Sequence, residues 1–313
     1  MIHGVINVYK EKGFTSHDVV AKLRGILKQK KIGHTGTLDP DAVGVLPVCL
    51  GNATKLCDML TDRNKEYIAE LLLGVVTDTQ DMTGNVKKRS EVQLEKEQVK
   101  KVIESFQGTS EQIPPMYSAI KVNGRKLYEL AREGKEIERK PRTIRIMEIE
   151  ILEMSLPLIR MRVVCSKGTY IRTLCHDIGE RLGCGGAMQS LVRSRVGEFL
   201  LKDALTLEQI EAARDQGSIG EKIISVDELF LEYPACVVEN RWKKLIENGN
   251  GFGKEQIGNM TGKKGEGAIK LPGEQNLENQ IRVYDEDGIF YGIYGWVPEK
   301  KRFEPIKMFL TKE

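Results

Sequence analysis

The residues best suited to chemistry lie in the segment 33–40, which reads Gly-His-Thr-Gly-Thr-Leu-Asp-Pro. Its carboxylate, Asp39, is flanked by glycines and a proline, which hold a loop in conformations that other residues resist. A carboxylate fixed in such a loop can act as a nucleophile, or can stabilise charge and move a proton. The alternative is a structural role, because Asp-Pro often only opens a turn.

Positive charge gathers on both sides of Asp39, although the formal net charge of the whole chain is only +3. Residues 160–195 carry seven cations against two acids. No acid occurs between Lys22 and Thr37, where five cations precede the aspartate: Lys22, Arg24, Lys28, Lys30 and Lys31. Localised basic segments favour a polyanion such as a nucleic acid as partner. A solvated surface is the simpler alternative for any single run of charge.

The elements around this loop can be predicted from periodicity. Alternating apolar residues predict a strand over 2–9, and apolar residues at helical spacing predict a helix from Thr15 or Ser16 to about Lys30. Apolar runs predict strands over 45–50 and 67–73, and a further helix is expected around 99–106. These elements would place Asp39 between a helix and a strand.

The second half of the chain contains another helix of interest. Alternation over 159–165 predicts a strand, and a helical apolar face over 171–182 ends before Gly183, a plausible C′ residue. Tyr170 and Arg172 lie off that apolar face near the helix start, which is where a functional residue is expected. Residues 111–146, rich in prolines and cations, read as an excursion from the main sheet with a short helix near Leu127.

The C-terminal part has a different texture. A capping box at 206–209 predicts one more helix, and short strands with glycine-rich turns follow Tyr233. Asp287-Gly288 between two apolar runs is a strong hairpin signal. We therefore expect a boundary near residue 233 and a small β-rich module after it.

The bulk composition indicates an ordinary soluble protein of 313 residues. No apolar run is long enough to span a membrane, and the N-terminus lacks the features of a signal peptide. The six cysteines have no regular spacing, which favours free thiols in a reducing cytosol. The four histidines form no metal-binding pattern. We therefore expect a cytoplasmic protein without a metal.

Six colinear motifs resemble the TruB family of bacterial tRNA pseudouridine synthases over most of residues 4–230. They are Gly33–Pro40, Leu46–Gly51, Lys65–Tyr67, Thr77–Asp81, Ile113–Ala119 and Cys165–Arg172. The resemblance implies an α/β (α+β) fold with a mixed, largely antiparallel central sheet. It also implies a catalytic domain over 1–232, a T-arm-gripping insertion over 111–146 and a PUA-like RNA-binding domain over 233–313.

The resemblance implies isomerisation of the T-loop uridine at position 55 of tRNA to pseudouridine, in which the target base is flipped out of its stack. The implied partner is tRNA, with no cofactor, no metal and no protein partner, and the protein is expected to be a monomer. The glycosidic bond breaks, the uracil turns, and a bond forms through C5. No P-loop or dinucleotide-binding glycine motif is present, which agrees with a reaction that needs no energy source.

The resemblance also assigns site residues. Asp39 matches the catalytic aspartate, Arg172 the arginine paired with it, and Tyr67 and Tyr170 the aromatic residues that hold the base, with Tyr67 able to transfer a proton. His34 and Leu191 match residues that bind the flipped nucleotide and form the pocket wall. RNA-backbone contacts are expected from these cations: Lys10, Lys121, Arg125, Lys126 and Arg142. The family commonly has Lys-Pro where this chain has Lys10-Glu11.

Three other functions compete with this interpretation. A non-catalytic RNA-binding or RNA-folding protein would need the same basic surfaces. A guide-RNA-dependent pseudouridine synthase would share the catalytic motifs, although the insertion favours the stand-alone enzyme. A phosphotransferase or glycosidase could use Asp39 as nucleophile, but a glycosidase usually needs a second carboxylate opposite the first. The best candidate for that second carboxylate is Asp81, which we interpret as structural.

Overall fold

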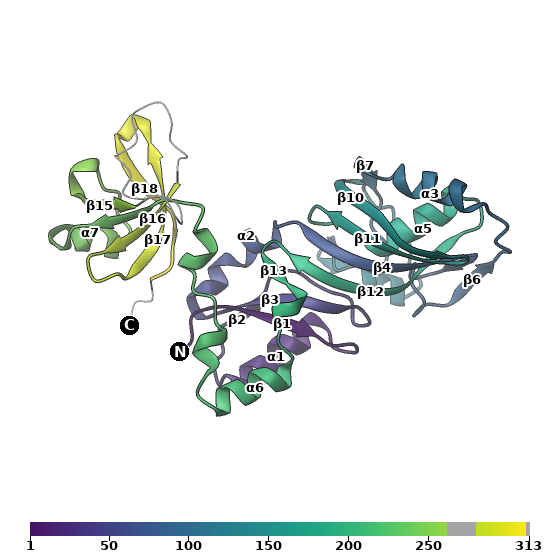
Figure 1. Ribbon diagram of the computed structural model, residues 1–313, viewed down its shortest axis with the longest axis horizontal. Coiled ribbons are helices and arrows are strands. Elements are labelled where there is room, and N and C mark those ends of the chain that lie inside the picture. The colour runs from purple at the N-terminus through teal and green to yellow at the C-terminus, as the bar shows by residue number, and fades with distance from the viewer. Residues whose placement is uncertain (262–279, 311–313) are drawn as a thin grey trace.

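The computed structural model describes residues 1–261 and 280–310, which form an elongated molecule built on two main β-sheets (Figure 1). The larger sheet has nine strands, with the main path β1-β3-β12-β4-β11-β10-β7. Strand β2 pairs with β3, and β13 pairs with β12. The smaller sheet has five strands in the order β15-β14-β16-β17-β18 and lies at one end of the molecule.

The strands of the larger sheet have these bounds: β1 Gly4–Lys10, β2 Ile32–His34, β3 Val43–Leu50, β4 Lys65–Leu73, β7 Gly108–Gln112, β10 Arg142–Ser155, β11 Leu158–Cys165, β12 Gly186–Val196 and β13 Phe199–Leu200. The smaller sheet comprises β14 Ala235–Val238, β15 Ile257–Thr261, β16 Gln280–Asp285, β17 Phe290–Val297 and β18 Arg302–Met308. Two short hairpins stand apart: β5 Val75–Thr77 with β6 Val86–Arg89, and β8 Lys121–Val122 with β9 Arg125–Lys126.

One junction in the larger sheet is parallel, and every other pairing of its named strands is antiparallel. There β12 meets β3 over two residue pairs, Val192 with Val43 and Arg193 with Gly44. We call this junction the seam. It joins a half made of β1, β2 and β3 to a half made of β12, β4, β11, β10 and β7, and the expected mixed, largely antiparallel sheet is confirmed.

Helices cover both halves of this sheet. Helices α1 Ser16–Ile26 and α6 Leu207–Asp215 bury apolar residues against β1 and β3, whereas α3 Lys96–Glu104 and α5 Ile171–Arg181 pack on β4, β10, β11 and β12. The shorter helices are α2 Cys57–Thr61, α4 Leu127–Arg132 and α7 Lys243–Glu247. In the described ranges, no helix is both long enough and apolar enough to cross a membrane.

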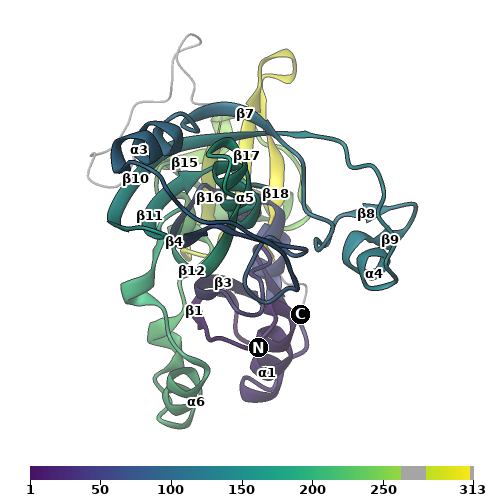
Figure 2. The same cartoon turned by 90° about the vertical axis from the view of Figure 1, so that its right-hand side faces the viewer.

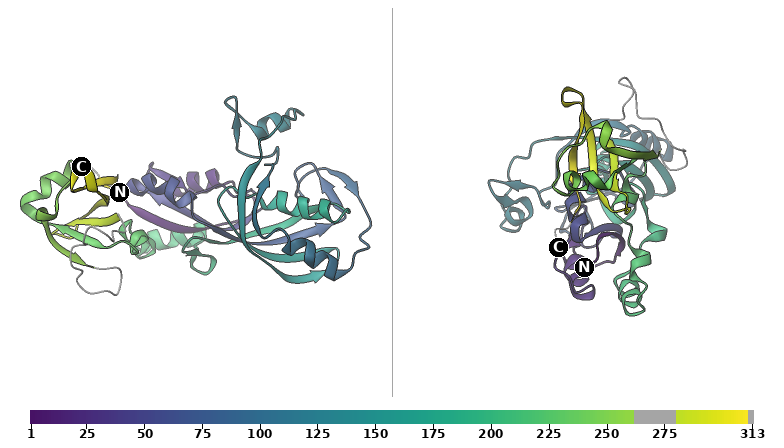
Figure 3. Two further views of the ribbon diagram at one scale, coloured as in Figure 1. Left: turned by 90° about the horizontal axis from the view of Figure 1, so that it is seen from above. Right: turned by 90° about the vertical axis from the view of Figure 1, so that its left-hand side faces the viewer.

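The segment with β8, β9 and α4 stands away from the main body (Figures 2 and 3). Its short helix confirms the helix predicted near Leu127 within the excursion 111–146. Leu127 is buried at the foot of this helix, while Lys121 and Arg125 are exposed on the hairpin before it. The projection therefore offers a cationic surface on a small, locally packed unit.

Most predicted elements are confirmed, and one helix boundary is wrong. The capping box at Thr206, the C′ glycine at Gly183 and the hairpin across Asp287-Gly288 all occur as expected. The first helix, predicted to reach about Lys30, ends at Ile26. Lys28 adopts a positive φ of 49°, which a helix cannot contain, so the chain turns there toward β2.

Candidate active site

The loop that carries Asp39 is fixed by hydrogen bonds to its backbone on both sides of the aspartate. The Leu38 N–H donates to the Ser16 hydroxyl at 2.9 Å, and the Pro40 carbonyl accepts from the Gly13 N–H at 2.9 Å. Upstream, the Thr35 N–H and hydroxyl both donate to the Pro47 carbonyl, at 3.1 Å each. The loop is thereby attached to α1, to the turn after β1 and to β3.

Lys10 is one of these anchors and does not offer its charge to the surface. Its side chain is fully buried, and its ammonium donates to the carbonyls of Glu11, Phe14 and Pro40 at 3.1, 2.6 and 3.0 Å. Burial lowers the pKa of this ammonium to about 8. The expectation that Lys10 contacts an RNA backbone is therefore corrected: the lysine holds the turn and the Asp39 loop, and it does so with Glu11 in the place of a proline.

Asp39 and Arg172 form a bidentate ion pair. Arg172 Nε lies 2.9 Å from Asp39 Oδ2, and Arg172 Nη2 donates to Asp39 Oδ1 at 3.2 Å. The same guanidinium donates to the carbonyls of Thr79 and Tyr117 at 3.2 and 2.9 Å. With the side chain of Arg172 only 6% exposed, these contacts fix both the position and the orientation of the carboxylate.

A second carboxylate shares this guanidinium. Asp81 Oδ2 lies 3.5 Å from Arg172 Nη1, and Asp81 Oδ1 accepts from the Thr79 hydroxyl at 2.7 Å and from the Thr83 N–H at 3.0 Å. Asp81 is buried, and its side chain is largely occupied by this loop. It stands behind the arginine and not across a cleft from Asp39, which agrees with the structural role expected for it.

Opposing effects act on the pKa of the Asp39 carboxyl. Burial raises the pKa of the Asp39 carboxyl and Asp81 raises it further, whereas Arg172 and Lys10 oppose the shift by favouring the ionised form. The side chain nonetheless remains 38% exposed, so one side of the carboxylate is open to an incoming ligand. The Asp39 carboxylate is therefore fixed by the positively charged Arg172 and remains accessible to solvent.

Tyr67 lies on β4 directly opposite Arg193 on β12. Burial raises the pKa of the Tyr67 hydroxyl, and the Arg193 guanidinium facing it acts in the opposite direction. Arg193 also donates to the carbonyls of Val45, Thr37 and Gly36, at 2.7, 3.4 and 3.5 Å. This buried cation therefore connects the Tyr67 strand to the Asp39 loop across the seam.

Tyr170 is held at the start of α5 by an amide clamp. Gln112, at the end of β7, donates from Nε2 to the Tyr170 carbonyl at 3.0 Å and accepts from the Tyr170 N–H at 2.8 Å. The ring is half-buried, and burial raises the pKa of its hydroxyl, while the nearby Arg142 and Arg172 charges lower it. The Asp39 charge raises the pKa of both the Tyr67 and the Tyr170 hydroxyl.

His34 and Leu191 lie next to this arrangement. The His34 ring accepts at Nδ1 from the Gly36 N–H at 3.3 Å and meets the His17 ring edge-on at 5.1 Å. Burial, aided by the charges of His17 and Arg193, lowers the pKa of His34 to about 4. Leu191 is buried in the same apolar cluster as Tyr67 and Leu38, beneath the site.

The four remaining cations expected at an RNA backbone lie on or beside the projecting segment. Lys121 and Arg142 are exposed, and Arg125 forms an ion pair with Glu133. Lys126 is half-buried against the ring of Tyr128, which its ammonium approaches at 5.3 Å from the centroid. These positions suit contacts to a backbone and not to a base held at Asp39.

Sequence reasoning missed Gln112 and Arg193 as supports of the site. Arg193 was visible only as one cation of a basic segment, and Gln112 stood beside the motif at 113–119 without a signal of its own. Their roles depend on partners 58 and 148 residues away in the chain, so the sequence nearby could not reveal them.

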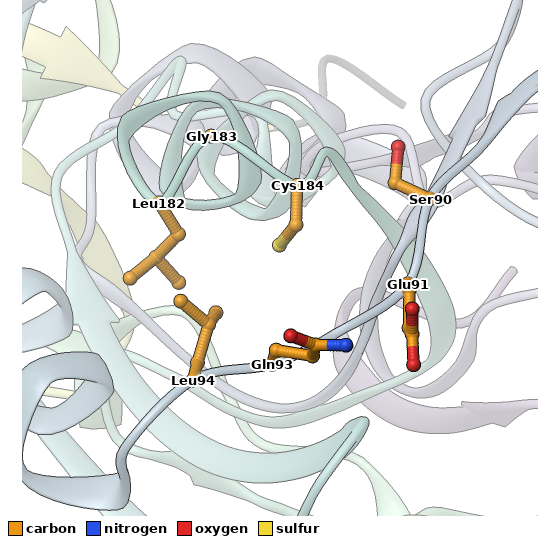
Figure 4. A pocket seen from close by; sticks show the side chains of 7 residues that line it. All are labelled: Ser90, Glu91, Gln93, Leu94, Leu182, Gly183 and Cys184. Atoms are coloured by element: carbon orange, nitrogen blue, oxygen red, sulfur yellow. The ribbon is translucent and has the colours of Figure 1, made fainter.

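A separate hollow lies at the other end of α5, between Leu182, Cys184 and the segment 90–94 (Figure 4). It is about 15 Å from Arg172 along the helix axis, given the 1.5 Å rise per residue. It is therefore not part of the Asp39 site. Over residues 1–261 and 280–310, no group of three or more His, Cys, Asp or Glu side chains is placed to hold a metal ion.

Comparisons with known proteins agree with this geometry. Residues 24–171 match the TruB family pseudouridylate synthase N-terminal domain, and residues 172–230 match the tRNA pseudouridylate synthase B C-terminal domain. A relative from Lachnoclostridium phytofermentans, named tRNA pseudouridine synthase B, is 54% identical over 99% of this chain and 100% of its own. A relative of the same name from Clostridium kluyveri is 45% identical over 98% and 99% of the two chains.

Among solved structures, a chain of a Cbf5-Nop10-Gar1 complex is 25% identical and superposes with a TM-score of 0.71, over 99% of this chain and 86% of that one. The match to the curated relatives runs through all of the residues that surround Asp39. The chain therefore belongs to the TruB family of pseudouridylate synthases.

Proposed function

We propose that this protein converts the uridine at position 55, in the T loop of tRNA, to pseudouridine. The observation that carries the proposal is the Asp39 carboxylate, held in a bidentate pair by a buried arginine and still 38% exposed. The names of the relatives at 54% and 45% identity support tRNA as the substrate.

The reaction is an isomerisation within one nucleotide. The bond between C1′ and N1 breaks, the uracil turns, and a bond forms between C1′ and C5; C5 gives up a proton and N1 gains one. Asp39 is placed to act on this nucleotide either as a nucleophile or by stabilising charge and moving a proton. Arg172 keeps the carboxylate ionised and aimed, and it does not need to move during the reaction.

The two tyrosines support a flipped substrate. A uridine inside a folded loop must leave its stack before an enzyme can reach C1′, and an aromatic ring can replace the stacking that is lost. Tyr67 and Tyr170 provide such rings on opposite elements, β4 and the start of α5. The buried Tyr67 hydroxyl, facing Arg193, is the group we propose for proton transfer.

The rest of the chain supplies RNA-binding surfaces in this proposal. The excursion 111–146 grips the T-arm through phosphate contacts from Lys121, Arg125, Lys126 and Arg142, which position the RNA without reading its sequence. Residues 1–232 form the catalytic domain and residues 233–313 a PUA-like module. We propose a monomer that works in the cytoplasm without a protein partner or cofactor.

The test uses an unmodified tRNA transcript incubated with the purified protein and no added cofactor, followed by digestion and mapping of pseudouridine. We expect product at position 55 with the wild type, and a rate at least about 10³-fold lower with Asp39→Asn. The amide keeps the shape of the side chain, so the Kd for tRNA should change by less than about threefold.

Asp41→Asn is the matched control, because Asp41 lies in the same loop, is 52% exposed and pairs only loosely with Lys12 at 3.8 Å. It should retain the wild-type rate. Tight tRNA binding without product would favour the RNA-folding function, and product that appears only with an added guide RNA would favour the guide-dependent enzyme. Equal losses of binding and turnover in Asp39→Asn would make Asp39 structural.

A further inference from the structure

The segment 116–118 brings the excursion into contact with the catalytic pair. The Tyr117 carbonyl accepts from Arg172 Nη2 at 2.9 Å, and Met116 and Ser118 on either side of it are buried. The backbone turns tightly here, since the Ser118 N–H donates to the Met116 carbonyl at 2.9 Å. Ser118 is therefore one residue away from a direct ligand of the guanidinium that holds Asp39.

The Ser118 hydroxyl is buried and unsatisfied. The residue is 5% exposed, and its Oγ makes no hydrogen bond of regular geometry in the described part of the chain, although it interacts with the Tyr170 hydroxyl. Buried hydroxyls in folded proteins are nearly always paired, because leaving one unpaired costs stability. A hydroxyl left in this state beside the Asp39–Arg172 pair can form its hydrogen bond with a bound substrate.

The polar group next to Ser118 belongs to the active site. The Ser118 hydroxyl lies close enough to the Tyr170 hydroxyl to lower the pKa of Tyr170 against the effect of burial, and the Arg172 and Asp39 charges act on the same phenol. The two neighbouring hydroxyls can each donate and accept a hydrogen bond.

The backbone of Ser118 is held by the projecting segment. The Tyr128 N–H donates to the Ser118 carbonyl at 3.1 Å, and the Leu127 N–H donates to the Ile120 carbonyl at 2.8 Å, so the first turn of α4 fixes the irregular segment that carries the serine. The hydroxyl is thus presented from a fixed backbone and is not a rotamer on a free loop.

We propose that Ser118 is a substrate-contacting residue whose hydroxyl, beside that of Tyr170, forms a hydrogen bond with the flipped nucleotide. The inference rests on the proposed function and adds a contact to it. A hydroxyl can bond the carbonyl and N–H edge of the uracil or the 2′-hydroxyl of the ribose, and the experiment below separates these two sources.

The first measurement is the single-turnover rate of pseudouridine formation in Ser118→Ala, with its melting temperature. Loss of one hydrogen bond to substrate should lower the rate about 3- to 10-fold. Because Oγ makes no hydrogen bond of regular geometry in the free protein, its removal should leave the melting temperature unchanged or raise it. Ser118→Thr, which keeps a hydroxyl, should recover part of the rate.

Ser105→Ala is the matched control, since its hydroxyl already donates to the Val102 carbonyl at 2.6 Å at the exposed end of α3. It should leave the rate unchanged. In the double variant Ser118→Ala/Tyr170→Phe, the loss should be smaller than the product of the two single losses, because both hydroxyls serve one group of the substrate.

Binding of a transcript with 2′-deoxyuridine at the target position distinguishes the ribose from the base. If Ser118 contacts the 2′-hydroxyl, wild type and Ser118→Ala will bind this transcript equally; if it contacts the uracil edge, the difference between them will persist. A wild-type rate in Ser118→Ala, or a lowered melting temperature or failure to fold, would overturn the inference by making the hydroxyl idle or structural. Absence of product with the wild type would instead refute the proposed function itself.

Discussion

At the scale of single residues, the site depends on one guanidinium with several simultaneous tasks. Arg172 contacts Asp39 through two nitrogens, approaches Asp81 with the third, and donates to two backbone carbonyls. Only a planar fork with five N–H groups can make these contacts together, so lysine at this position would lose most of them.

His34 gives a prediction about pH and stability. Burial lowers the pKa of its imidazole from 6.5 to about 4. Between pH 6.5 and pH 4, His34 is therefore protonated in the unfolded chain but neutral in the folded protein. The stability associated with His34 is therefore fully present above pH 6.5 and falls as the pH drops toward 4. In thermal melts, His34→Gln should lose less stability than the wild type over this interval. Parallel pH curves for the two proteins would contradict the prediction.

The sequence pointed to the candidate site residues, but not to Gln112 and Arg193, which hold them in place. Asp39, Tyr67, Tyr170 and Arg172 stand in motifs with a recognisable order, and the structure pairs Asp39 with Arg172. Lys10 was expected at an RNA backbone because it matches a family position; it is instead buried, with three backbone carbonyls accepting from its ammonium.

At the scale of elements, the seam between β3 and β12 decides where the site can form. Asp39 belongs to the loop before β3, whereas Arg172 and Tyr67 belong to α5 and β4 on the other half of the sheet. Gly44 permits the close approach of the halves: it has a φ of 111°, and a Cβ there would lie 2.3 Å from the Arg193 carbonyl oxygen. Neither the parallel pairing nor this approach has a local sequence signal. Periodicity predicted β3, but β12 was not predicted as a strand, and Leu191 within it was expected only as a residue of the pocket wall.

Substitution of this glycine should damage the sheet and the site together. Gly44→Ala places a methyl group against the backbone of β12 in a conformation that L-residues resist, so we expect a loss of about 2–4 kcal/mol in the free energy of unfolding and a marked loss of activity. Denaturant titration and the pseudouridine assay measure the two effects.

Gly25→Ala is the control for that experiment. Gly25 lies in α1 with nothing within 4 Å of an added Cβ, so alanine there should leave stability unchanged or raise it. If Gly44→Ala behaved like Gly25→Ala, the seam would not depend on the close approach described here.

At the scale of the whole molecule, the smaller sheet is joined to the larger one through a shared apolar cluster. Ile293 and Phe309 from the C-terminal part are buried with Val5, Leu56 and Phe230. Phe309 stacks on Phe290, with ring centroids 5.7 Å apart, and its carbonyl accepts from the Asn52 side chain. The boundary expected near residue 233 came from the change to short strands and glycine-rich turns in the sequence. The apolar cluster contains residues from both sides of that boundary, and contacts between such distant segments have no local sequence signal.

Phe309 should therefore matter for the stability of both parts. Phe309→Ala is expected to cost about 3–5 kcal/mol by leaving a cavity between the sheets, which calorimetry would detect as a lowered melting temperature. Ile306→Ala is the control, because Ile306 is 52% exposed on β18 and should change stability little. A wild-type melting temperature for Phe309→Ala would mean that the two sheets do not depend on this contact.

The short seam also sets the order in which the protein loses its properties under stress. The Asp39–Arg172 pair spans the seam, and the seam consists of two residue pairs. A small separation of the halves, far short of unfolding, is enough to pull the carboxylate off its counter-charge. We therefore expect enzymatic activity to be lost at a lower denaturant concentration than secondary structure, which parallel activity and circular-dichroism titrations would measure. Under moderate stress, the protein would be inactive but still folded.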